Sequence, residues 1–428
     1  MSKWRVTLNN FIKKTLFILF ILLIYRIGSF ISVPAIDTEI VKSIFDGTSN
    51  QLIQAINMFS GGGAERISIL VLGIMPFITA AITIQGIALF LPQFKELKES
   101  GEKGQIELNR YVKYLSFFIA LGQTIALTTY LTGFINDSPN LITTDYFSFL
   151  ILFFTSTITG VFITMFFAEM INEYGYGSGL SFIIFANIAT SIPSLLAVIF
   201  ESFTTNQNNL FVILFAISLI LLFSFTIIFE GGTKKIPLSS PNDYKTSNYL
   251  PIKVNVATIM PAIFIFMIIS LIMMIDQLIS ERLNYSIVIF MQNNIAFHSF
   301  LYWFNVFIFI VLVSLFYSKS VFNSKSIAEN LKNSNTYIKG IRPNRPTVEF
   351  LEKHRKMLAI ASSIFLFLIV FVPQYLSDLS GITFVLGGIS ILIMANVSYE
   401  VKKNFDLSNK EKSVKILKNE IIGKFNKK

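Results

Sequence analysis

Long apolar stretches recur along the whole chain and restrict what it can fold into. Runs of roughly 20 residues are long enough to cross a bilayer as helices, and they lie at about 15–33, 70–91, 112–134, 147–169, 180–200, 210–229, 254–275, 300–318, 358–376 and 382–399. With 53% hydrophobic and only 14% charged residues, they predict an all-α polytopic membrane protein with ten transmembrane helices. The first run lacks a small-residue cleavage site, so we expect a retained span rather than a signal peptide.

The positive charge of the chain is arranged by topology. Of its 35 Lys and Arg residues, 31 lie at the two termini or in the segments Lys95–Lys113, Lys234–Lys253 and Lys319–Lys356. These segments all fall on one side if ten spans are threaded through a membrane. The positive-inside rule therefore predicts that both termini are cytoplasmic, and the net charge of +10 does not require nucleic acid.

The composition also removes several classes of chemistry. There is no Cys and there are only two His residues, so thiolate sites, cysteine nucleophiles and most zinc sites are excluded. No Gly-x-x-x-x-Gly-Lys loop for binding nucleotide phosphates is present. We therefore expect no cofactor, no metal and no enzymatic activity.

The stretch Asn57–Gln85 departs from the pattern of simple spans. It begins with Gly61-Gly62-Gly63, continues through the charged pair Glu65 and Arg66, and only then becomes apolar, with Pro76 inside the apolar run. Glycines free the backbone, and a short segment before a Pro-interrupted helix is typical of backbone that lines a cavity.

Two pairs of spans resemble each other. Ile74–Ile78 is similar to Ile259–Ile263, and Gly179–Ile188 aligns without a gap on Gly388–Val397. The pairs fall on the second and fifth spans of each five-span half, which predicts an inverted repeat. Deep in these spans there are isoleucines and no charged residues, which fits either ordinary helix packing or an apolar constriction that excludes ions by dewetting.

Several ordered motifs are similar to those of the SecY family, the channel subunit of the bacterial Sec protein translocase (the SecY/Sec61-alpha family). They are RIGSFISVP from Arg26, NMFSGG from Asn57, LGIMPFITAAITIQ from Leu72, INEYGYGSGLSFIIFANI from Ile171, YLPIKVNVATIMPAIF from Tyr249 and FNSKSIAENLKNSNTYIKGIRPNRPT from Phe322. The resemblance covers nearly the whole chain. It implies two five-helix halves around an hourglass pore: an N-terminal half at 1–205, a C-terminal half at 206–400 and a basic cytoplasmic tail at 401–428.

The resemblance assigns roles to particular residues. The pore ring falls on Ile74, Ile78, Ile184, Ile188, Ile263 and Ile393. The plug falls on about 57–70 and includes Phe59, Ser60, Gly61, Gly62, Gly63, Ala64, Glu65 and Arg66. Polar candidates for a lateral gate between spans two and three and spans seven and eight are Gln85, Gln123 and Asn255, for which interhelical hydrogen bonding is an equal alternative.

The resemblance also implies partners and a location. SecE and SecG are expected to complete a heterotrimer, with signal peptides and nascent chains as substrates. The SecA ATPase or the ribosome is expected to dock on cytoplasmic loops 230–253 and 319–357 through Lys234, Lys235 and Arg342. The expected location is a bacterial plasma membrane, or an organelle membrane of bacterial origin as the alternative.

Two departures from the family pattern and two rival functions stay open. The 230–253 loop is short and lacks an arginine-rich tip, and Asn187 replaces a small glycine beside the ring, which puts motor docking and the tightness of the gate in question. A transporter for a small solute also uses inverted repeats, but it normally places charged residues in its core helices. A structural scaffold for membrane assembly is the other alternative.

Overall fold

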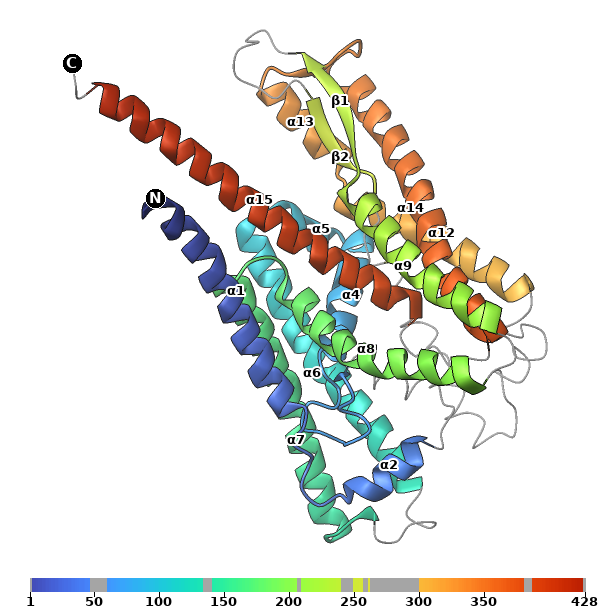
Figure 1. The fold of residues 1–428 in the computed structure, drawn as a ribbon. Coiled ribbons are helices and arrows are strands. Elements are labelled where there is room, and N and C mark those ends of the chain that lie inside the picture. Colours follow the sequence, from blue (N-terminus) through green and yellow to red (C-terminus); the bar gives the residue numbers. More distant parts are fainter. Residues whose placement is uncertain are drawn as a thin grey trace. The chain divides into compact units, whose positions relative to one another are not determined.

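The structure is a computed structural model that describes residues 2–46, 60–133, 141–205, 209–239, 249–256, 261, 300–380 and 387–425 (Figure 1). The chain forms two compact units. The first unit contains Met1–Ile78, Lys113–Leu195 and Asn396–Lys428, and the second contains Thr79–Val112 and Leu196–Ala395.

Apolar helices dominate both units. Among the described residues, six helices are long and apolar enough to cross a membrane, and a seventh is added if the bent pair Met75–Ala88 and Pro92–Lys98 counts as one span. Helix α1 (Ser2–Gly28) is not among the six. The predicted span 254–275 lies largely outside the described residues, so the total of ten stays a prediction.

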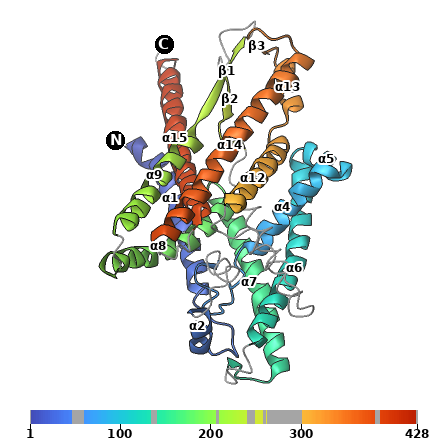
Figure 2. The ribbon, with the colours of Figure 1, turned by 90° about the vertical axis from the view of Figure 1, so that its right-hand side faces the viewer.

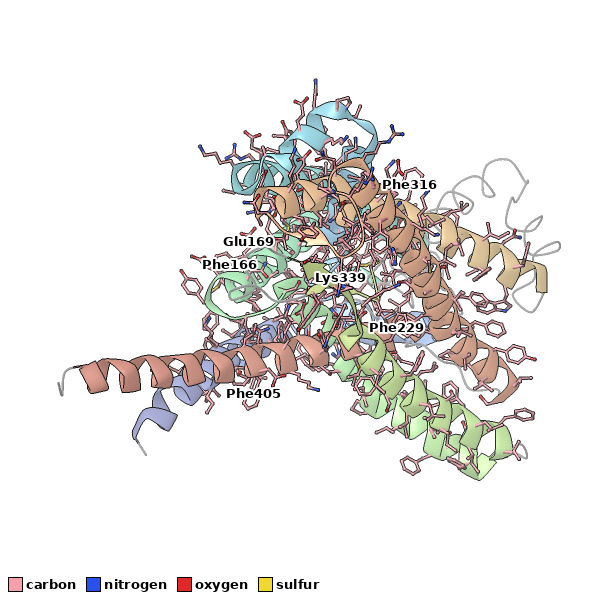
Figure 3. The ribbon with its side chains drawn as sticks, turned by 90° about the horizontal axis from the view of Figure 1, so that it is seen from above. Phe166, Glu169, Phe229, Phe316, Lys339 and Phe405 are labelled. Atoms are coloured by element: carbon pink, nitrogen blue, oxygen red, sulfur yellow. The ribbon has the colours of Figure 1, made fainter. Side chains whose placement is uncertain are left out.

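The first unit is built on helices that cross its full length. Helix α1 runs alongside α7 (Tyr146–Tyr174), and the unit also contains α2 (Thr38–Asp46), most of α6 (Glu102–Gly133) and most of α8 (Gly179–Thr205) (Figure 1). On the exterior, Glu169 of α7, labelled in Figure 3, forms an ion pair with Lys113 of α6. The buried core of this unit joins α6 and α7 to the segment that follows the glycines.

The second unit packs α14 (Arg345–Ser380) against α9 (Asn209–Gly231) and α12 (Phe300–Val321). It also contains α4 (Met75–Phe90) after its first turn, α5 (Pro92–Glu99), and the start of α15 (Gly387–Phe425). Phe229 of α9, labelled in Figure 3, stacks on Phe365 of α14 with ring centroids 3.9 Å apart. Aromatic and aliphatic side chains thus fill the space between these helices.

A small antiparallel sheet lies at one end of α14, beside α13 (Ser324–Asn333) (Figure 2). The strands β1 (Thr233–Ser239), β2 (Tyr249–Lys253) and β3 (Tyr337–Ile338) are arranged in the order β2-β1-β3, with Lys235 opposite Pro251. Ile236, Ile252 and Ile338 point into a buried apolar cluster, while their neighbours along the strands are mostly exposed. These strands lie in the segments 230–253 and 319–357 that were predicted as cytoplasmic loops, and the sheet was not predicted.

The second predicted span begins later than expected. Residues 69–74 form turns, and the helix starts at Met75. Pro76 therefore lies in the first helical turn, where its missing N–H has no helical partner to lose. The expectation of a helix interrupted by this proline is wrong: the proline helps to start the helix. The first span also ends earlier than expected, at Gly28 rather than at Val33.

Candidate functional site

The glycine-rich segment forms a compact series of turns. Gly61 and Gly62 adopt φ values of +66° and +82°, a region that costs a residue with a Cβ atom conformational energy. The hydroxyl of Ser60 accepts a hydrogen bond from the backbone N–H of Ala64 at 3.1 Å. Phe59, the first residue of the predicted plug list, lies outside the described residues.

The chain after the glycines is fixed to the segment that follows α1. The N–H of Val33 donates to the carbonyl of Ile67, and the N–H of Ile69 donates to the carbonyl of Ile31, both at 2.9 Å. Ala64 and Ile67 are fully buried in the core of the first unit. The predicted plug, over its described residues, is therefore packed into this unit and held at its C-terminal end by backbone hydrogen bonds.

Two arginines lie against one aromatic ring beside this segment. Arg26 of α1 and Arg66 place their guanidinium carbons 4.7 and 4.4 Å from the ring centroid of Phe30. Arg26 also donates a short hydrogen bond to the carbonyl of Gly61. The ring and the carbonyl both offer negative potential to the cations. No partner for Arg66 could be predicted from the sequence, and the structure places its guanidinium over the ring of Phe30.

The predicted pore-ring residues are buried wherever the structure describes them. In the first unit, Ile74 precedes α4, Ile78 lies in its first turn, and Ile184 and Ile188 lie one turn apart on α8, all at most 2% exposed. In the second unit, Ile393 on α15 is equally buried. Ile263 lies outside the described residues.

Asn187 lies beside the two ring isoleucines of α8 and is 1% exposed. Its amide nitrogen donates to the hydroxyl of Tyr25 on α1 at 2.9 Å. A Cβ atom added to Gly61 would lie 2.6 Å from Oδ1 of Asn187 and 3.1 Å from its Cα. The side chain of Asn187 thus contacts both α1 and the glycine-rich segment. A glycine at this position has no side chain and could not make these contacts.

The three predicted gate residues occupy different environments. Gln85 on α4 and Gln123 on α6 are half-buried, and Oε1 of Gln123 is buried without a hydrogen-bond partner among the described residues. Asn255 is 1% exposed, and its amide nitrogen donates a short hydrogen bond to Glu230. Glu230 is a buried carboxylate at the end of α9 that the sequence analysis missed, because an acid at the edge of a span resembles a loop residue.

The predicted docking residues are exposed in the second unit. Lys234 and Lys235 lie on β1, with the ammonium of Lys235 4.9 Å from the ring centroid of Tyr249, and Arg342 lies in the loop before α14. Sequence reasoning missed Arg355 as a structural residue. It is 3% exposed and donates to Ser318 at 2.6 Å and to Glu352 at 2.7 Å. In the part of the chain that the structure describes, no group of three His, Cys, Asp or Glu residues could hold a metal.

Comparisons with known proteins match this chain to one family. A family model described as SecY matches residues 68–402. The protein translocase subunit SecY of Buchnera aphidicola subsp. Schizaphis graminum (strain Sg) is 34% identical over 393 residues, which cover 88% of this chain and 87% of the relative.

Solved structures show the same fold. One described as the structure of a protein conducting channel matches with a TM-score of 0.65 and 17% identity, covering 92% of each chain. Another, of Sec61 in the canine ribosome–channel complex from the endoplasmic reticulum, matches with a TM-score of 0.61 and 17% identity, again covering 92% of each chain. At these identities the two structures establish a shared fold alone.

Proposed function

Because this chain belongs to the SecY family, we propose that it forms a protein-conducting channel. The channel translocates secretory polypeptides across the membrane and releases transmembrane segments sideways into lipid through a lateral gate. The family match over residues 68–402 is the observation that carries this proposal. The apolar helices of both units supply the membrane-spanning frame that such a channel needs.

In this proposal, Ile74, Ile78, Ile184, Ile188, Ile263 and Ile393 form an apolar ring that a translocating chain passes in extended form. Isoleucine side chains offer no strong binding site, so chains of many sequences can slide past them, and a narrow apolar ring resists ions by dewetting. The burial of the five described isoleucines is compatible with a closed ring and equally with helix packing.

The glycine-rich segment is proposed to be the plug. A signal segment inserting between the gate helices would displace it, and the positive φ values of Gly61 and Gly62 mark turns about which the backbone can reorganise at low cost. Gln85, Gln123 and Asn255 stay proposed gate residues. For Asn255, the hydrogen bond to Glu230 favours a second role, in which it joins the start of span seven to the end of span six.

The proposed partners follow the family. SecE and SecG would complete the complex, and SecA or the ribosome would dock near Lys234, Lys235 and Arg342, which are exposed cations able to contact carboxylates and phosphates. We propose a bacterial plasma membrane with cytoplasmic termini, from the distribution of Lys and Arg. The channel would not be an enzyme; a partner or the membrane potential would supply the energy.

Crosslinking in the reconstituted complex tests this function. Because the chain has no cysteine, single cysteines replacing Ile78 or Ile184 are unique. A stalled secretory chain with a cysteine in its mature part should form disulfides with both, and no disulfide should form with a cysteine replacing exposed Phe147 of α7. Absence of crosslinks together with accumulation of a small solute in vesicles would instead favour the transporter.

A further inference from the structure

Three side chains from outside the glycine-rich segment form a connected group beside Gly61. Tyr25 and Arg26 are consecutive on α1, and Asn187 lies on α8. All three belong to the first unit, together with Gly61. Tyr25 and Asn187 are at most 1% exposed, so the hydrogen bond between them is shielded from water and is stronger than it would be at a surface.

Arg26 holds the backbone of the segment directly. Its guanidinium donates to the carbonyl of Gly61, and the same Nη1 lies 3.2 Å from the hydroxyl of Ser29. A hydrogen bond from a cation to a carbonyl is about twice as strong as a neutral one. If the segment left, the guanidinium would lose this acceptor, and we therefore expect the bond to oppose departure.

Asn187 also packs against Gly61. Gly61 packs so closely that even a methyl group there would overlap the amide oxygen and the backbone of Asn187. The hydrogen bond from Asn187 to Tyr25 fixes the amide in this orientation. Tyr25 is thus a positioning residue for Asn187, and the adjacent Arg26 acts on the carbonyl of the same glycine.

We infer that Tyr25, Arg26 and Asn187 form a seat for the plug at Gly61, and that this seat sets how readily the plug leaves the idle channel. The inference rests on the proposed channel function. It accounts for Asn187 as a functional residue: its amide packs against Gly61 of the plug, a contact that a glycine at the same position lacks.

The test measures plug departure in the complete complex in proteoliposomes. Ser60→Cys is introduced as the only cysteine; Ser60 is fully buried, so a membrane-impermeant maleimide should label it only when the plug moves. Arg26→Gln should raise the labelling rate about ten- to a hundredfold, as expected for loss of a charge-assisted hydrogen bond. Tyr25→Phe, which removes one oxygen, should raise it about two- to tenfold.

A double variant separates a seat from general loosening. Because Tyr25→Phe and Asn187→Ala break the same hydrogen bond, the pair should label no faster than Asn187→Ala alone, whereas independent effects would multiply. Lys42→Gln, at an exposed cation on α2, is the matched control and should label at the parent rate.

Two results keep this inference distinct from the proposed function. If the parent channel translocates a secretory protein but Arg26→Gln, Tyr25→Phe and Asn187→Ala all label within twofold of it, the seat is wrong and the channel stands. If the parent translocates nothing, the channel proposal itself fails. A lower melting temperature in Tyr25→Phe without faster labelling would also overturn the seat, because it would show a purely structural role.

Discussion

A single added methyl group at Gly160 should test how the plug region is packed. Gly160 lies on α7, and a Cβ atom there would lie 1.9 Å from the carbonyl oxygen of Ile69 and 2.8 Å from its carbonyl carbon. Carbon and carbonyl oxygen normally approach no closer than about 3.3 Å. The Gly160→Ala variant must therefore move the two backbones apart by about 1.4 Å.

Neither backbone can make this movement freely. Ile69 is tied to Ile31 by a 2.9 Å hydrogen bond, and Val161, next to Gly160, belongs to the buried core. Overpacking of a core costs about 1–3 kcal/mol, and weakening the Ile69 hydrogen bond adds about 1 kcal/mol. We expect the free energy of unfolding to fall by about 2–4 kcal/mol, which for a chain of 428 residues corresponds to a fall in Tm of roughly 2–5 °C.

The assay is thermal unfolding of the purified complex in detergent. The readout is the fraction of the protein that still elutes as a single species in size-exclusion chromatography after heating at each temperature. Gly122→Ala on α6 is the matched control, because nothing lies within 4 Å of its added Cβ atom. Alanine also favours a helix over glycine by about 1 kcal/mol, so this variant should be at least as stable as the parent. Equal Tm values for the two variants would refute the close contact between α7 and the segment after the plug.

Two further predictions concern charged groups. Arg355→Met should lower the free energy of unfolding by about 2 kcal/mol or more in chemical denaturation, because Arg355 is buried and donates to Ser318 and Glu352. The control Arg345→Met removes an exposed ion pair and should change the free energy of unfolding by less than about 1 kcal/mol. Glu400→Gln should lower Tm by roughly 1–3 °C, because the carboxylate accepts from the N–H just before α8 and stabilises the positive end of that helix; a salt titration that leaves this difference unchanged would contradict the electrostatic origin.

The membrane frame and the family could be predicted from the sequence because their signals are long. Apolar runs of about 20 residues have few alternatives to a spanning helix, and the ordered motifs are confirmed by the family match. The sheet was missed for the opposite reason. Its strands β1, β2 and β3 are only seven, five and two residues long. One partner of β1, the strand β3, comes from a distant part of the chain, so no local pattern specifies that pairing.

The polar contacts of the candidate site could be located but not paired. Asn187 was noticed as an unusual residue and Arg66 as an unexplained charge, but their partners Tyr25 and Phe30 come from another segment. The sequence of an apolar helix does not distinguish an aromatic residue whose polar group is used from one that only packs, because both occur in such helices. Only the tertiary structure separates Tyr25, whose hydroxyl is used, from the many aromatic residues that pack.

The internal duplication is supported by geometry as well as by letters. Gly179 and Gly388 are aligned in the sequence match, and they lie at the starts of α8 and α15, which correspond to the fifth predicted span of each predicted half. A Cβ atom on Gly179 would lie 2.0 Å from the carbonyl oxygen of Ala168 on α7, and one on Gly388 would lie 1.8 Å from that of Ile369 on α14.

In the first unit α8 approaches the backbone of α7 at one aligned glycine, and in the second unit α15 approaches the backbone of α14 at the other. Such an approach is possible only where one helix presents a hydrogen in place of a side chain. Two unrelated helices are not expected to carry such a glycine at the same aligned position. A duplicated packing unit accounts for both contacts, and it explains why Ile184 and Ile393, five residues after each glycine, are both buried on their helices.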